Sequence, residues 1–150
     1  MQSIQNTTKN WELLFAESDY TVITEILKLT KEKKFDELEY ALESYLNYIK
    51  KREEREILWK LRDLMMLILL WKFSDQYRDK ENSVKISQYR SEIEDILQFE
   101  ACITRETLKI KWSEIFEIAK DRAGNYNPAI LNTDILSWDE VFNQLYEESR

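Results

Sequence analysis

One glycine, Gly124, and one proline, Pro128, stand in a chain of 150 residues. Average usage would place about ten glycines and about seven prolines in a chain of this length. Sharp chain reversals and left-handed backbone conformations depend on these two residues and on a few small polar ones. The sequence therefore allows very few sharp reversals and favours long regular segments.

Apolar residues recur with the period of an α-helix along almost the whole chain, and no segment alternates with period two for long enough to predict a strand. The cleanest pattern is Leu38, Leu42, Tyr45 and Ile49, at i, i+4, i+7 and i+11. The sequence predicts an all-α fold, a single-domain helical bundle of about five or six helices. We expect a polar N-terminal tail over 1–17, partly ordered at most, and one helical domain over 18–150.

The segment 57–73 is the predicted central helix, because from Leu64 onward it is apolar on every side and must be surrounded by other helices. Between Ile49 and Ile57 lies KKREERE, which contains neither glycine nor proline. The sequence leaves open whether helices 37–50 and 52–73 are continuous or separated by a tight turn. Helix starts are predicted from N-capping residue types: Ser18 or Asp19, Asp36, Asn82 or Ser83, Thr104, and Ser137 with Glu140 as a capping box. Gly124 is predicted at the C′ position of a helix.

The composition excludes most familiar catalytic and cofactor-binding motifs. The chain has no histidine, so it cannot form a Ser-His-Asp or Cys-His pair, an HExxH zinc site or a Glu-x-x-His di-iron site. A single glycine excludes both GxGxxG and the Walker phosphate loop. The formal net charge of −7 disfavours nucleic acid as a partner, and the basic run at 50–52 is interrupted by glutamates. The sequence predicts no cofactor and identifies no small-molecule ligand.

Localisation can be predicted from apolar runs and cysteine usage. The longest apolar run, 64–71, is far shorter than the roughly 20 residues of a membrane span. The first ten residues show no secretory signal, and one thiol, Cys102, fits a reducing compartment. We expect a soluble cytoplasmic protein that does not enter a membrane.

The order of several short segments resembles that of a known helical family. These segments are Asp19-Tyr20, 33–38 (KKFDEL), 64–73 (LMMLILLWKF), 86–90 (ISQYR) and 136–141 (LSWDEV). From Asp19 to about Glu147 the chain is similar to the largely cyanobacterial family known as domain of unknown function twenty-nine. The resemblance implies an α-helical fold and a cytoplasmic protein, and it implies no function.

The chain departs from this family at several polar positions. Where the family usually reads His-Leu-Leu-Lys-Trp, residues 67–71 keep Trp71 and lack the histidine and the lysine. At most one of the family's paired acidic residues is present near Glu43-Ser44, and its Ser-Trp is not recognisable near Glu81-Asn82. A site built from those polar positions would be absent from this chain.

Carboxylates are the only abundant groups that could support catalysis. Glu53-x-x-Glu56 and Glu92-x-x-Asp95 are similar to the paired acidic motifs of all-α nucleoside triphosphate pyrophosphatases, which hold magnesium. The four residues therefore define an alternative reading, a magnesium-dependent nucleotide hydrolase. Helical spacing favours a solvated face instead, with Glu56 and Lys60 as a surface ion pair. We expect Cys102 to be a small buried residue, and Trp71, Trp112 and Trp138 to lie in the core.

The remaining interpretation is a non-enzymatic helical module that works by contact with a protein partner or with itself. Ile110 and Ile118 lie eight residues apart, off the stripe of their helix, and Tyr40 and Tyr48 have the same spacing. Such second stripes are typical of helix-binding or self-association surfaces, although a wider core explains them equally well.

Overall fold

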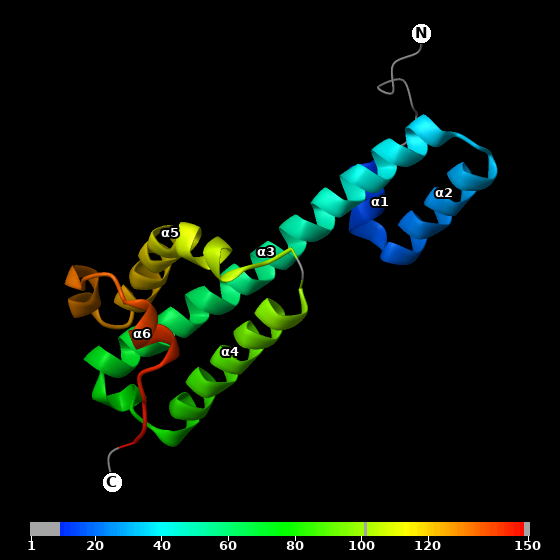
Figure 1. Ribbon diagram of the computed structural model, residues 1–150. Coiled ribbons are helices and arrows are strands. Elements are labelled where there is room, and N and C mark those ends of the chain that lie inside the picture. The colour runs from blue at the N-terminus through cyan, green and yellow to red at the C-terminus, as the bar shows by residue number, and fades with distance from the viewer. Residues whose placement is uncertain (1–9, 101, 149–150) are drawn as a thin grey trace. The chain divides into compact units, whose positions relative to one another are not determined.

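The computed structural model describes residues 10–100 and 102–148 (Figure 1). Over these residues the chain forms six α-helices and two short 3-10 helices, and no strand, which confirms the all-α prediction. The α-helices are α1 (Trp11–Glu17), α2 (Asp19–Lys31), α3 (Phe35–Phe73), α4 (Lys80–Phe99), α5 (Arg105–Gly124) and α6 (Trp138–Phe142). The 3-10 helices are η2 (Asp75–Tyr77) and η3 (Pro128–Asn132).

The charged run KKREERE lies inside α3, a continuous helix of 39 residues. Lysine, arginine and glutamate are all good helix formers, and nothing in the run interrupts the backbone hydrogen bonds. The question left open by the sequence is therefore decided in favour of one helix. The predicted central helix, 57–73, is its second part, and Ile57, Leu61 and Ile68 there are fully buried.

The chain divides into two compact units, an N-terminal unit of residues 1–52 and a C-terminal unit of residues 53–150. The boundary falls within α3. Within the tail predicted over 1–17, partly ordered at most, residues 11–17 form α1, and Trp11 and Phe15 on this helix are buried. Residues 1–9 of the predicted tail lie outside the described residues.

In the N-terminal unit, α1, α2 and the first part of α3 surround a small core. It consists of Trp11, Phe15, Val22, Leu29 and Ala41. The turn between α2 and α3 ends α2 with two hydrogen bonds, from Lys34 N to Leu29 O (3.0 Å) and from Lys33 N to Thr30 O (3.1 Å). This pattern requires a left-handed residue at C′, and here it is Lys33 with φ 57°.

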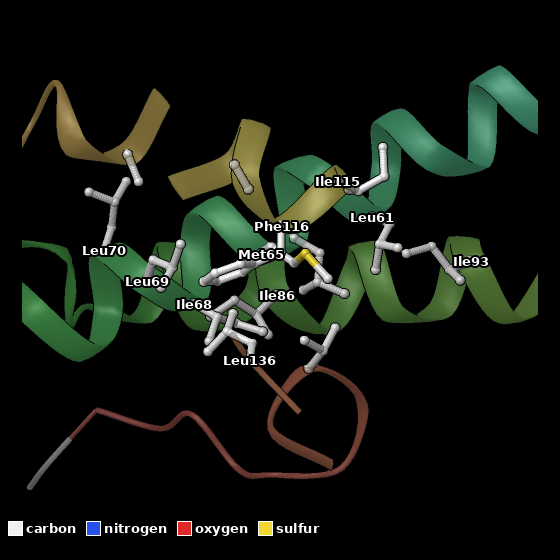
Figure 2. Packing of buried hydrophobic residues seen from close by; sticks show 14 of the residues in the cluster. Leu61, Met65, Ile68, Leu69, Leu70, Ile86, Ile93, Ile115, Phe116 and Leu136 are labelled. Carbon is white, nitrogen blue, oxygen red and sulfur yellow. The ribbon is translucent and has the colours of Figure 1, made fainter. Parts of the chain in front are cut away.

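In the C-terminal unit, the second part of α3 packs against α4, α5 and the segment around α6. Figure 2 shows Met65 of α3, Ile86 of α4 and Phe116 of α5 gathered at the centre of this core. Leu136, just before α6, closes it on another side. Large aliphatic and aromatic side chains fill the interior, as a chain with few small residues requires.

Most predicted helix starts are confirmed. Ser18 caps α2, Thr104 caps α5, and Ser137 with Glu140 forms a capping box on α6. Asp36 lies in the first turn of α3 rather than at its cap. The prediction of Asn82 or Ser83 as a cap is wrong, because Asp79 caps α4 by accepting a hydrogen bond from Asn82 N.

Two predictions near the C-terminal end of the chain need correction. Gly124 is the last residue of α5, and no glycine in the described residues has a positive φ, so it does not serve as a left-handed C′ residue. Its lack of a side chain admits Leu131, because a Cβ there would lie 2.4 Å from Leu131 Cδ2. The apolar pattern after Ser137 also predicts one final helix whose inward residues are Trp138, Val141, Phe142, Leu145 and Tyr146. That helix ends at Phe142, and beyond it Leu145 is exposed, whereas Tyr146 is buried as predicted.

Candidate interaction surface

Two of the carboxylates proposed as magnesium ligands, Glu92 and Glu53, have other partners. Lys60 Nζ lies 2.9 Å from Glu92 Oε2, and Gln88 donates a hydrogen bond of 3.3 Å to the other oxygen of Glu92. The hydrogen bond from Lys60 lowers the pKa of Glu92 and raises that of Lys60. The predicted ion pair between Glu56 and Lys60 is therefore wrong, because Lys60 on α3 reaches across to α4 instead.

Glu53 accepts a hydrogen bond of 2.6 Å from the thiol of Cys102. Cys102 is exposed, which corrects the prediction that it is buried; it follows the end of α4 in a turn rather than sitting on a helix face. The hydrogen bond to Glu53 raises the pKa of the thiol, so the protonated form is favoured. A nucleophilic cysteine requires the opposite shift.

Asp95, the fourth proposed ligand, is exposed on α4. Across residues 10–100 and 102–148, no group of three or more acidic or cysteine side chains is arranged to hold a metal ion. The four proposed ligands Glu53, Glu56, Glu92 and Asp95 are thus not brought together there as one binding set. The alternative reading as a magnesium-dependent hydrolase gains no geometric support from them.

Aromatic residues pack against the C-terminal core as the sequence predicts. Trp71 is buried, and Trp112 and Trp138 are half-buried with their rings stacked 5.4 Å apart. Trp112 Nε1 donates a hydrogen bond of 2.7 Å to Leu136 O, so its polar atom has a partner. These rings hold the segment before α6 onto α5.

The two apolar pairs that lie off the main stripes differ in their exposure. On α5, Ile110 is 73% exposed and Ile118 is 39% exposed, so both face away from the core. On α3, Tyr40 is exposed but Tyr48 packs in the N-terminal core, with its ring 5.2 Å from Phe15. A wider core therefore explains Tyr48, whereas the α5 pair stays available for contact.

Several exposed apolar side chains of the N-terminal unit lie on the hairpin of α2 and α3. Figure 1 shows α2 running beside the first part of α3, joined by the turn at 32–34. Asp19 Oδ1 accepts hydrogen bonds from Tyr45 (2.6 Å) and Arg52 (3.4 Å), which places the start of α2 level with residues 45–52 of α3. The two helices are therefore antiparallel.

α1 covers one face of this hairpin, because the ring of Phe15 packs at a tilt against those of Tyr45 and Tyr48 and lies buried with Trp11. At about 100° per residue, Leu42 and Leu46 point 100–140° away from the buried Ala41. Five large side chains lie on the uncovered face, each between 42% and 67% exposed, and we define them as the hairpin face: Ile23, Leu27, Phe35, Leu42 and Leu46. Tyr20 is also exposed on α2, near its start.

Sequence reasoning missed the hairpin face because it assigned Leu42 to the buried stripe with Leu38 and Tyr45. Leu38 and Tyr45 do pack against the core, but Leu42 is rotated out of it. One signal was present in the sequence. Tyr20, Ile23 and Leu27 follow i, i+3, i+7 on α2, a second apolar stripe beside the one that carries Val22 and Leu29.

Three of the segments that resemble the family, 64–73, 86–90 and 136–141, meet in the C-terminal unit. Lys72 on α3 forms an ion pair with Glu140, at the start of α6. Arg90 on α4 donates to Val141 O (2.7 Å) and lies over the ring of Tyr146 (5.4 Å). Burial raises the pKa of Tyr146 to about 12. These contacts join three distant parts of the sequence, so the order and spacing of these three segments have a structural basis.

The family whose sequence profile matches is described as domain of unknown function DUF29, and the match covers residues 14–147. The chain belongs to the DUF29 family. Neither a comparison with curated proteins nor one with solved structures gives a match. In the described part of this DUF29 chain, no helix is both long enough and apolar enough to cross a membrane.

Proposed function

We propose that this DUF29 chain is a non-enzymatic helical module that acts by binding a protein chain. The observation that carries the proposal is the hairpin face, five large apolar side chains gathered on two adjacent helices. Single exposed apolar residues are common on monomeric proteins, whereas contiguous apolar patches mark interaction sites. The proposal includes a cytoplasmic location, which the single thiol supports.

The free energy gained by burying the hairpin face can be compared with the cost of association. Fully burying a leucine or isoleucine side chain is worth about 1.5–3 kcal/mol. Covering five half-exposed side chains of this size therefore gains several kcal/mol per chain. That is comparable with the lower part of the range, about 4–15 kcal/mol, that association costs in lost freedom of motion. The hairpin face is large enough to contribute substantially to a stable contact, and the α5 pair, with two residues, is not.

The test compares two double variants of the full chain. Leu42→Glu with Leu46→Glu places charge on the hairpin face, and Ile110→Glu with Ile118→Glu makes the same change on α5. Because all four positions are exposed, we expect the free energy of unfolding of each variant to lie within about 1 kcal/mol of the wild-type value. We expect self-association, or retention of a specific protein partner, to be lost in the hairpin variant and kept in the α5 variant.

A wild-type chain that is monomeric at every concentration and retains no protein that the hairpin variant loses would refute the proposal. The magnesium alternative is checked on the same material by thermal unfolding with magnesium and nucleotides. A ligand at 100 times its dissociation constant adds about 2.7 kcal/mol. A stabilisation that requires both metal and nucleotide and disappears in Glu92→Gln would favour the hydrolase instead.

A further inference from the structure

We propose that the occupant of the hairpin face is a second copy of this chain, with α2 of each copy lying against α3 of the other. The inference rests on the proposed function, because it names the partner of the same surface. Its basis is the pattern of charges that border the hairpin face, which is complementary to itself.

The level of each residue along the hairpin follows from the contacts of Asp19. Since Asp19 lies level with the middle of 45–52, each step forward along α2 corresponds to one step back along α3. Lys28 is then level with Glu39, and Lys31 is level with Asp36. The turn at 32–34 closes the hairpin just beyond Lys31 and Asp36.

The two borders carry opposite charges at this end of the hairpin. Lys28 and Lys31 lie on the outer side of α2, and Asp36, Glu39 and Glu43 lie on the outer side of α3. All five side chains are exposed. Within the described residues none of them forms an ion pair. Each hairpin therefore presents one basic border and one acidic border at matched levels.

A two-fold axis parallel to the helices places the basic border of each copy opposite the acidic border of the other copy. Such an axis keeps the two turns at the same end and places α2 of one copy over α3 of the other. Lys28 then faces Glu39 of the second copy, Lys31 faces Asp36 of the second copy, and the symmetry repeats both pairs. At the same levels, Ile23 and Leu27 of one copy meet Leu42 and Leu46 of the other.

The resulting assembly is a four-helix arrangement in which neighbouring helices are antiparallel, a common way for helical hairpins to bury an apolar face. The local pairing opposes the repulsion expected between two chains of formal net charge −7. Because the charges lie at the rim of the contact, they select the partner and its orientation more than they add affinity.

The experiment is a charge exchange in the full chain, followed by sedimentation velocity over a range of concentrations. One variant carries Lys28→Glu and Lys31→Glu, and the other carries Asp36→Lys and Glu39→Lys. Each variant alone places like charges opposite one another, and we expect its dimer to dissociate at least about tenfold more readily than the wild type. A 1:1 mixture of the two variants restores both pairs and gives a heterodimer, and the chain with all four changes gives a homodimer.

The control matched to the Lys28→Glu, Lys31→Glu variant carries Lys51→Glu and Lys80→Glu, which lower the net charge by the same amount away from the hairpin face. We expect this control to dimerise as the wild type does. Far-UV circular dichroism and the midpoint of thermal unfolding check that every variant is folded.

Three results would overturn the inference. The first is a wild type that stays monomeric; if the Leu42→Glu, Leu46→Glu variant still loses a different retained protein, the proposed function survives and only the second copy is rejected. The second is a dimer that neither charge variant weakens. The third is a dimer weakened by both charge variants but not restored by mixing them, which excludes the pairing of α2 with α3 across the axis.

Discussion

The close approach of Leu131 to Gly124 leads to a prediction about the stability of Gly124→Ala. Two opposing contributions to the free energy of unfolding, helix propensity and the packing of Leu131, can each be estimated from the structure. Replacing Gly124 with alanine adds a Cβ that would lie 2.4 Å from Leu131 Cδ2 and 2.8 Å from Leu131 Cγ. Gly124 is the last residue of α5 and has no positive φ, so the backbone itself accepts alanine. In a free helix this substitution would stabilise by about 0.5–1 kcal/mol, because alanine has the higher helix propensity.

Against this gain stands the displacement of Leu131. The contact is shorter than any real Cβ contact, so the leucine side chain must move. Leu131 is 46% exposed, so the burial it can lose is at most about half that of a fully buried leucine, or about 1–1.5 kcal/mol. The two terms together predict that Gly124→Ala is neutral to destabilising, by up to about 1 kcal/mol.

The decisive variant is Gly124→Ala in a chain that also carries Leu131→Ala. Removing the leucine removes the clash, so there Gly124→Ala should stabilise by about 0.5–1 kcal/mol. The double-mutant cycle then gives a coupling of about 1–1.5 kcal/mol. The measurement is urea unfolding followed by far-UV circular dichroism, read as the midpoint at constant slope. Equal stabilisation by Gly124→Ala in both backgrounds would show that Leu131 does not pack on Gly124.

Three further predictions follow from single contacts. Lys33→Gly should stabilise the chain by about 0.5–1 kcal/mol in thermal unfolding, because Lys33 holds a left-handed conformation at φ 57° that glycine adopts without strain; no gain would contradict that backbone conformation. Lys72 lowers the pKa of Glu140, so the pair stabilises the fold above the pKa of an unfolded glutamate and loses this contribution as pH falls through the lowered folded value. Glu140→Gln should therefore cost about 0.5–1.5 kcal/mol at pH 7 and progressively less in acid, and a cost that does not change with pH would refute the pairing. The hydrogen bond to Glu53 raises the pKa of Cys102, so Glu53→Gln should speed alkylation of Cys102 by iodoacetamide a few-fold at pH 7, with an unchanged rate as the contrary result.

Much of the secondary structure could be predicted because its signals are local. Ser18, Thr104 and Ser137 cap their helices as expected, since a side-chain oxygen at the N-cap satisfies amides only two or three residues away. The sequence predicts the cap of α4 at Asn82 or Ser83 rather than at Asp79 because all three are capping residue types and lie within about one helical turn of each other. Local pattern identifies the region and does not choose among adjacent candidates.

The left-handed backbone position shows a second limit of prediction from the sequence. The sequence assigned the left-handed position to Gly124, the only glycine, whereas Lys33 holds that conformation and Gly124 admits a neighbouring side chain. A lysine at C′ is tolerated because the hydrogen bonds of Lys33 and Lys34 close the end of α2. No sequence rule based on residue preference would select it.

The sequence predicts that an exposed apolar surface exists, but it does not predict which residues form it. The sequence indicated that apolar residues lie outside the main stripes, and Ile110 and Ile118 are indeed exposed. It placed Leu42 in the core and missed its role, because an apolar stripe wider than 100° fits several rotations of the helix. The carboxylates illustrate the same point, since Lys60 could pair with Glu56 on its own helix or with Glu92 on another.

The sequence by itself determined that this chain is all-α, because helical period and the near absence of glycine and proline act along the backbone, residue by residue. It also determined membership of the DUF29 family, through short segments in a constant order. The tertiary structure decided which face of each helix is covered. That decision depends on what lies against the helix: α1 covers one side of the α2–α3 hairpin and leaves Leu42 and Leu46 exposed on the other. Burial is a property of neighbours in space, and a periodic pattern specifies only that a helix has an apolar side.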